Sequence, residues 1–284
     1  MPFSTIEHSS VGVVSKRIMS LKRAVQTAKP AVCAERALIW TDYHRQPANP
    51  SKSPHIQMAE ALGEVLKRKS ITIYPDELIV GNFTSKRVGG AVYPELHGVP
   101  VMLDLFRFAR RKTNPLAVSK RDIGGLLKTI PFWSHRFMPL KAYPSLWKKV
   151  RFVANQLRAH FYLINECGGI AHLAPDYAKL VAIGTDGIVA EARAKLQKTG
   201  LDDEQQYFYR AVIIIAQALA DFGERYAVLA RKMADRCQDE ERRNELRLVA
   251  DICGSNLRHG ADSFYGALQA IFLAQIALNQ ESLD

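Results

Sequence analysis

The 284-residue sequence has few cysteines and no paired metal-ligand motif. Its four cysteines are far apart, and no C-x-x-C pair occurs among Cys33, Cys167, Cys237 and Cys253. This spacing excludes zinc-finger and thioredoxin-like motifs and favours reduced thiols in a cytoplasmic protein. No two of the eight histidines stand three or four residues apart. The sequence therefore predicts no helical metal site.

The sequence also lacks a membrane-spanning segment and a targeting signal. No run of 18 apolar residues occurs; the nearest, 264–278, is shorter and contains Gln269 and Gln275. The first residues show no basic region followed by an apolar one, so we expect no signal peptide. Together these absences predict a cytoplasmic chain without a membrane partner.

Acidic residues are almost absent from one segment. Between Arg107 and Arg158 stand 13 lysines and arginines and a single acid, Asp122. The segment has a net charge of +12, whereas the whole chain has a net charge of +11, so the charges of the rest of the chain sum to −1. A solvated basic face is the simplest interpretation, and an acidic partner is the functional alternative. No nucleic-acid-binding motif accompanies the charge, so a nucleic-acid partner is not expected.

The longest periodic stretch runs from Asp203 to Cys237. Its apolar residues follow one another at steps of four and three, which places them on one stripe of an α-helix. Acids precede the stripe and cations close it, as the helix dipole favours. Further apolar residues beside the stripe predict a helix buried on more than one side. The stripe consists of Phe208, Val212, Ile215, Leu219, Phe222, Tyr226, Leu229 and Met233.

The remaining segments fit one large domain over residues 1–284. We expect helices over 14–70, short strands over 71–97, a basic, proline-rich irregular excursion over 98–146, and a helical layer over 147–284. The strands are expected at 71–74 and 78–81, where β-branched and apolar residues cluster. The predicted fold class is mainly α with a few short strands.

Six short segments, in this order, resemble glycyl radical enzymes, the pyruvate formate-lyase family. Their number and order carry the resemblance, which spans roughly residues 14 to 280. Ala171 and Gly266 stand where the family has a glycine and an acid. The nearest branches are the dehydratases, decarboxylases and C–C or C–N lyases. The segments are Glu35-Arg36-Ala37 with Thr41-Asp42, ITIYPDELIVGN at 71–82, Tyr93-Pro94-Glu95, AHLAPDY at 171–177, Arg225-Tyr226-Ala227, and FYGALQAIFL at 264–273.

The resemblance implies the N-terminal portion of a helix-wrapped, ten-stranded α/β barrel, with the barrel incomplete. In that family a separate radical SAM activating enzyme installs a radical on a C-terminal glycine, and the radical passes to a central cysteine. This sequence has no R-V-x-G-Y-type loop, and its one C-x-E, beginning at Cys33, lies in the wrong place. We therefore expect a truncated chain with no catalytic residue and no directly bound cofactor.

The resemblance places two candidate substrate-binding residues, His172 and Asp176, in this chain. An imidazole at a substrate cavity can hydrogen-bond a hydroxyl or carboxylate, or move a proton. The alternative for His172 is capping the helix begun at Pro175, and the alternative for Asp176 is supporting that helix's dipole. Cys167 is expected to be a buried apolar residue. Arg225 is expected to pair with a carboxylate for structural reasons.

Two functions follow as expectations. The first is the N-terminal segment of a glycyl radical enzyme, inactive alone, whose missing part another chain supplies. The second is a stand-alone helical interaction protein whose basic segment binds an acidic partner. The last helix, expected over 264–280, is apolar around most of its circumference. Such a helix requires burial on all sides, so we also expect self-association into a homo-oligomer or completion by a second polypeptide.

Overall fold

The computed structural model describes residues 15–49, 52–98, 101–102, 104–136, 143, 145–158 and 175–281. These residues are mainly helical with two short strands, as predicted. The strands are β1 (Ala31–Cys33) and β2 (Gly89–Ala91). The helices are α1 (Lys16–Gln26), α2 (Glu35–Arg45), α3 (Pro54–Arg68), η2 (Pro94–Gly98), η3 (Leu105–Arg110), α5 (Lys120–Leu127), α6 (Ile130–Trp133), α8 (Leu146–Leu157), α10 (Tyr177–Leu196), α11 (Asp203–Arg236), α12 (Glu240–His259) and α13 (Phe264–Glu281).

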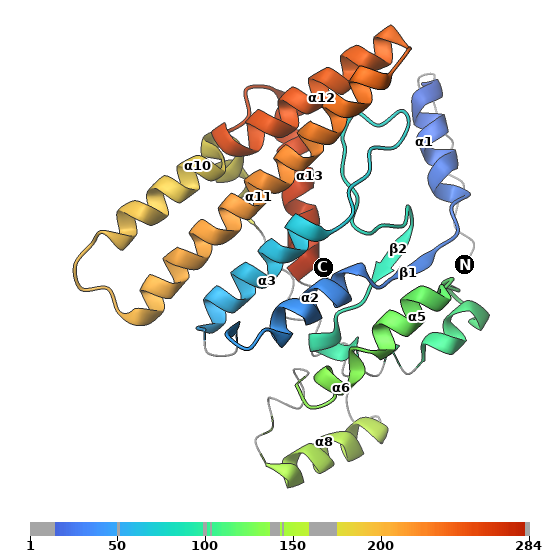
Figure 1. The fold of residues 1–284 in the computed structure, drawn as a ribbon, viewed down its shortest axis with the longest axis vertical. Coiled ribbons are helices and arrows are strands. Elements are labelled where there is room, and N and C mark those ends of the chain that lie inside the picture. Colours follow the sequence, from blue (N-terminus) through green and yellow to red (C-terminus); the bar gives the residue numbers. More distant parts are fainter. Residues whose placement is uncertain are drawn as a thin grey trace, which may run out of the picture.

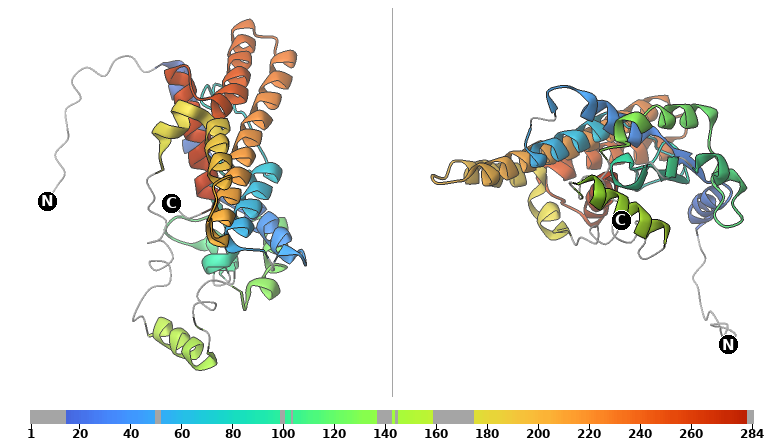
Figure 2. Two further views of the ribbon diagram at one scale, coloured as in Figure 1. Left: turned by 90° about the vertical axis from the view of Figure 1, so that its left-hand side faces the viewer. Right: turned by 90° about the horizontal axis from the view of Figure 1, so that it is seen from below.

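The long helix α11 is the axis of the molecule. It contacts α3, α10, α12 and α13, and α12 runs back along it as an antiparallel partner (Figure 1). The helices α2 and α3 lie on one side of α11, and β1 and β2 lie beyond α2. The helix α8 stands apart from this body at one end of the molecule (Figure 2). The main core is therefore built where α3, α11, α12 and α13 meet.

The predicted bounds of α11 are confirmed, but its most buried stripe differs from the predicted one. Asp202 caps the helix through the backbone N–H of Gln205. The buried positions lie at steps of four and three beside the large residues. A side chain at Gly223 would place a Cβ 2.7 Å from the carbonyl oxygen of Cys253. Small residues thus allow α12 to approach closely. They are Ala216, Ala220, Gly223, Ala227, Ala230 and Ala234.

The helix α10 breaks at Gly184, where the sequence predicts an interruption. The backbone of Gly184 has a φ of 62°, a region that glycine adopts without steric cost. The break leaves the carbonyl of Val181 free to accept from the backbone N–H of Ala261 at 2.8 Å. Gly254 lies inside α12.

The predicted strands at 71–74 and 78–81 are wrong. Neither segment forms a strand; within 71–97 the strand is β2, which pairs in parallel with β1 in the register Ala31↔Gly89. Cys33, predicted in a helix, belongs to β1, because the helix begins only at Glu35. Residues 78–84, called the 78–84 segment below, bond through several backbone groups to side chains and not to a neighbouring strand.

The last helix, α13, is buried on one side only. Leu273 and Ile276 lie in the main core, whereas Phe264 is 80% exposed and Leu268 and Phe272 are about two-fifths exposed. No described residue covers this face, which is the apolar surface that the sequence predicts to self-associate or to bind a second polypeptide. Among the described helices, none alone has the length and hydropathy to cross a membrane. The helices α12 and α13 meet both criteria only when they are taken together, as a pair bent by 74°.

Candidate functional site

Segments that carry the family resemblance meet at Asn82. This side chain is 6% exposed, and its Oδ1 accepts from the Tyr226 hydroxyl at 2.6 Å and from the Thr72 backbone N–H at 2.8 Å. Its Nδ2 donates to the carbonyls of Ser70 and Thr84. Every hydrogen-bonding position of the amide is occupied. Asn82 therefore joins the turn after α3, the 78–84 segment and α11.

A second amide, Gln269 of α13, takes the place of a neighbouring strand. Its Oε1 accepts from the Val80 backbone N–H and its Nε2 donates to the Val80 carbonyl, both at 2.8 Å. The side chains of Tyr265 and Gln280 donate to the carbonyls of Leu78 and Phe83. Buried backbone groups must be paired, and here α13 pairs them without a β-ladder. This explains why the predicted strand does not form.

Lys69 is buried beneath the same segment. The side chain is 1% exposed, and its ammonium donates to the Asn82 carbonyl at 2.6 Å and lies 5.2 Å from the centre of the Phe222 ring. No carboxylate pairs with it directly in the described part of the chain. Burial lowers the pKa of Lys69 to about 8, opposed by the more distant charge of Glu35. An uncompensated buried ammonium opposes folding near neutral pH.

The stability of the chain is expected to rise with pH because of Lys69. The unfolded lysine has a pKa of about 10.4, so between about pH 8 and pH 10 the unfolded state holds more protons than the folded state. Stability then increases with pH, by about 2 kcal/mol over this window. The free energy of unfolding of the wild type minus that of Lys69→Met should show this rise. Taking the difference removes the opposing titration of Cys253, whose pKa burial raises to about 12. A flat difference would contradict the assignment.

Arg36 joins two further resemblance segments to the end of α13. It is 3% exposed, and its guanidinium lies between the rings of Trp40 and Tyr93, at 4.3 and 4.1 Å from their centres. One nitrogen donates to the Gln280 carbonyl at 2.7 Å, and the other two bind the Glu95 carboxylate. This planar, bidentate and stacked geometry is specific to arginine. Arg36 thus anchors the last turn of α13 to α2 and η2.

Arg225 does not form the predicted ion pair with a carboxylate. Its guanidinium donates to the carbonyls of Leu66 and Lys69. Carbonyls at the end of a helix lack a partner inside the helix, and these two lie at the end of α3. A cation at a helix C-terminus also complements the helix dipole. The structural role expected for Arg225 is therefore carried out by capping α3, not by pairing with an acid.

Of the two candidate substrate-binding residues, His172 lies outside the described residues, as does Cys167. Asp176 is the N-cap of α10, and its Oδ1 accepts from the Lys179 backbone N–H at 2.9 Å. It borders a pocket of about 230 Å³ between α3, α10, α11 and α13, lined mainly by aliphatic side chains such as Leu62 and Leu219. The pocket beside Asp176 is therefore apolar, with Asp176 at its edge.

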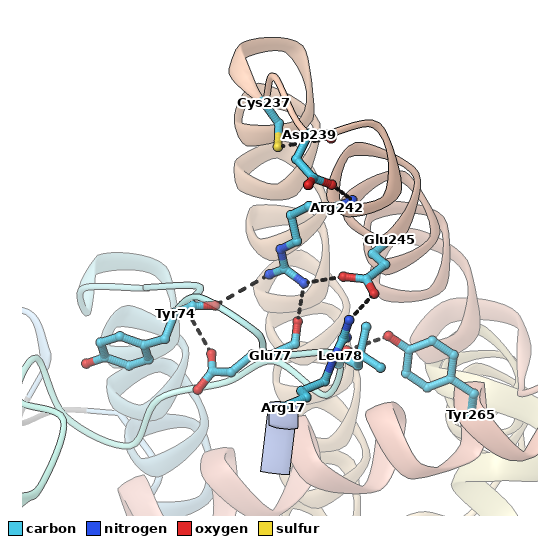
Figure 3. A network of polar contacts seen from close by, with 9 residues as sticks. All are labelled: Arg17, Tyr74, Glu77, Leu78, Cys237, Asp239, Arg242, Glu245 and Tyr265. Carbon is cyan, nitrogen blue, oxygen red and sulfur yellow. Dashed lines mark hydrogen bonds and ion pairs between the residues drawn. The ribbon is translucent and has the colours of Figure 1, made fainter. Parts of the chain in front are cut away.

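A polar network ties α1 to the residues just before the 78–84 segment. Arg242 of α12 donates to the Glu77 carbonyl and to the Glu245 carboxylate, both at 2.9 Å, and Glu245 also pairs with Arg17 of α1 (Figure 3). The helix α1 has no buried residue, so these polar contacts hold it in place. Among the described residues, no group of three histidines, cysteines or acids is arranged to hold a metal ion.

The comparisons with known proteins agree with this arrangement of motifs. A family model described as pyruvate formate lyase-like matches residues 12–284. The chain belongs to the pyruvate formate lyase-like family. It is 31% identical over 276 residues to the probable dehydratase YbiW of Escherichia coli (strain K12), covering 95% of this chain and 34% of that protein.

Two solved structures share the fold of this chain over about a third of their own length. The glycerol-bound B12-independent glycerol dehydratase from Clostridium butyricum matches with a TM-score of 0.86 and 27% identity, over 96% of this chain and 35% of that chain. A glycyl radical enzyme from Archaeoglobus fulgidus matches with a TM-score of 0.81 and 28% identity, over 94% and 34%. The resemblance to glycyl radical enzymes is confirmed, and the chain spans about a third of the length of these relatives, at their N-terminal part.

Several residues that organise this pyruvate formate lyase-like chain are not singled out by the sequence. Asn82, Gln269 and Arg36 are visible as members of the family segments, and that membership is their only signal. Lys69 follows two other basic residues and has the sequence context of an exposed helix end. It packs against Phe222 of α11, which lies more than 100 residues away along the chain.

Proposed function

We propose that the chain is the N-terminal segment of a glycyl radical enzyme of the dehydratase, decarboxylase and lyase branch, contributing scaffold and part of a substrate cavity. One observation supports this most strongly: 96% of the chain matches a glycerol dehydratase of which it covers only 35%. On this proposal residues 1–284 form a single partial domain whose barrel is incomplete. The chain would be inactive alone and would act in the cytoplasm.

The scaffold role rests on three side chains that hold the 78–84 segment and the end of α13 in place. Asn82 and Gln269 position the backbone of this segment against α11 and α13. Arg36 holds the last turn of α13 through the Gln280 carbonyl. Groups placed on rigid, fully paired elements can orient a substrate to a fraction of an ångström. These residues thus position the cavity without touching substrate.

For the cavity, His172 and Asp176 are the proposed substrate-binding residues, and no catalytic residue is assigned. Asp176 fits a supporting role because its carboxylate already caps α10 at the edge of the apolar pocket. His172 stands four residues before Asp176. The family resemblance implies that its imidazole would meet a polar group of the substrate. An apolar wall beside a few polar groups is the usual composition of a small-molecule site.

No described cysteine is assigned the thiyl role of the family. The thiol of Cys237, at the end of α11, donates to the Asp239 carbonyl at 3.4 Å. Cys33 is 3% exposed, and its sulfur lies 3.2 Å from the Ser85 hydroxyl oxygen. Cys253 is 1% exposed in the core between α11 and α12. Neither fits a thiol that meets substrate, so no radical step is assigned to them. A radical SAM activating enzyme and a polypeptide supplying the remaining two thirds are the proposed partners.

Fusing the chain to the C-terminal two thirds of the C. butyricum glycerol dehydratase tests the cavity role. The activated fusion is expected to dehydrate glycerol, and His172→Ala should lower turnover by about 100-fold or more while leaving the melting temperature within a few degrees. Asp176→Ala should mainly lower the melting temperature, because it removes an N-cap worth about 1 kcal/mol. If His172→Ala loses turnover only because the fusion unfolds, the result would favour the alternative in which His172 caps the helix begun at Pro175. A folded fusion that does not turn over glycerol would contradict the proposal.

A further inference from the structure

The helix α8 exposes an apolar stripe that no described part of the chain covers. Leu146 and Trp147 are 78% and 74% exposed, and Val150 and Val153 are about half exposed. With 3.6 residues per turn these positions lie on one side of the helix. Trp147 differs from the two other tryptophans, Trp40 and Trp133, which are buried in the core. A contiguous exposed apolar stripe usually marks a binding surface.

The stripe lies opposite the buried side of α8. Among the described residues of α8, Phe152 is buried, with 7% of its surface exposed, and packs on Tyr143 with ring centres 5.0 Å apart. Phe152 lies about 200° around the helix from Val150. Phe152 and the stripe therefore occupy opposite sides of α8. The left view of Figure 2 shows α8 standing clear of the helical layer.

Two cations flank the stripe. Lys149 and Arg151 each lie about 100° from Val150, on opposite sides of it, whereas Lys148 lies near Phe152 on the side away from the stripe. The sequence of α8 contains no acid. Within the part of the chain that the structure describes, none of these three cations forms an ion pair. They belong to the segment 107–158, which carries +12.

We propose that α8 binds the surface of an anionic lipid bilayer, lying in the plane of the headgroups with its apolar stripe toward the acyl chains. A basic amphipathic helix with a tryptophan on its apolar side is suited to this interface. Lys149 and Arg151 can bury their aliphatic stems and still reach anionic headgroups. Several cations near such a surface strengthen binding together. The proposal revises the expectation of no membrane partner, which rested on the absence of a spanning segment.

A bilayer fits this surface better than an acidic protein does. The stripe carries no polar side chain that would set the register of a folded partner. Lys149 and Arg151 lie on the two flanks of the stripe, where a plane of headgroups can meet both cations at once. The helix α1 is also basic, but Arg17 is paired with Glu245 and Ser20 donates to Asp76. It is the matched comparison for α8.

Vesicle binding tests the proposal on the full chain. One vesicle preparation is phosphatidylcholine alone, and the other contains about 30% phosphatidylglycerol, whose anionic headgroups attract clustered cations. Co-sedimentation at low salt is expected to show binding about tenfold tighter, or more, with the anionic vesicles. Trp147 fluorescence should shift to the blue on binding. The variants Trp147→Ser/Val150→Ser and Lys149→Gln/Arg151→Gln should each weaken binding by about tenfold or more without a change in melting temperature.

The comparison variant Ile18→Ser/Val25→Ser in α1 should bind as the wild type does. Equal binding by the α8 variants and the wild type, or a loss confined to the α1 variant, would overturn the proposal. Binding of polyglutamate in the absence of binding to anionic vesicles would also overturn it, and would assign the basic segment to an acidic protein partner instead.

Discussion

Replacing Asn82 with leucine is expected to lower the free energy of unfolding by about 4 kcal/mol. The substitution keeps the approximate size of the side chain but removes all its hydrogen-bonding groups. The Thr72 N–H, the carbonyls of Ser70 and Thr84, and the Tyr226 hydroxyl then lose a partner. Each buried polar group left unpaired costs about 1–3 kcal/mol. Urea unfolding followed by circular dichroism measures the loss.

Asn244→Leu is the matched control for this substitution. Asn244 is exposed on α12, and a surface change of this kind usually alters stability by no more than about 0.5 kcal/mol. If Asn82→Leu cost no more than Asn244→Leu, Asn82 would not organise the 78–84 segment. A loss in Asn82→Leu accompanied by a smaller m-value would instead indicate that the segment detaches before the rest unfolds.

Replacing Arg36 with methionine should cost about 3–5 kcal/mol, the usual penalty for removing one member of a buried ion pair. The Glu95 carboxylate, with 17% of its side chain exposed, would lose its partner. The Gln280 carbonyl would lose its donor, and the rings of Trp40 and Tyr93 would lose the stacked guanidinium. The same unfolding measurement applies. Arg36→Lys should recover only part of the loss, because an ammonium cannot bind the carboxylate through two nitrogens while stacked.

Arg68→Met provides the corresponding surface ion-pair control. Arg68 pairs with Asp42 at 2.9 Å, and both side chains are about half exposed. Exposed pairs of this kind contribute about 0–1 kcal/mol. A full recovery of stability in Arg36→Lys would contradict the importance of the stacked, bidentate geometry. Equal costs for Arg36→Met and Arg68→Met would contradict the anchoring of α13 through Arg36.

Most of the helices were predictable from the sequence because their signals are local, but α5 (Lys120–Leu127) forms inside 98–146, which the sequence predicts to be irregular. The bounds of α11 follow from its periodicity, its capping residue Asp202 and its terminal charges. The burial within α11 was less predictable. Hydrophobicity draws attention to large residues such as Phe208, which is half exposed. The closest helix contact is made by Ala227 and its small neighbours, because their size admits α12.

The 78–84 segment was not predictable in the same way. Its apolar residues predict a strand. Whether such a segment joins a sheet depends on what pairs its N–H and C=O groups. Here the partners are Gln269, Tyr265 and Tyr226, which lie more than 140 residues away. Local propensity carries no information about such partners.

The polar residues of the candidate site show the same limit. The family segments pointed to Asn82 and Arg36 only as members of motifs, without their partners. The sequence predicted a structural role for Arg225, but the acceptors are the carbonyls at the end of α3 and not an acid. The burial of Lys69 was not predictable, because lysine at a helix end is usually exposed.

Anaerobic electron paramagnetic resonance tests the central claim most directly. The purified 284-residue polypeptide is treated with a radical SAM activating enzyme and S-adenosylmethionine, and the C. butyricum glycerol dehydratase with its activating enzyme serves as the positive control. The dehydratase should show the doublet of a glycyl radical. The 284-residue polypeptide should show none, because its residues include no radical-bearing glycine loop. A glycyl radical doublet from the polypeptide alone would contradict the account of it as a scaffold segment.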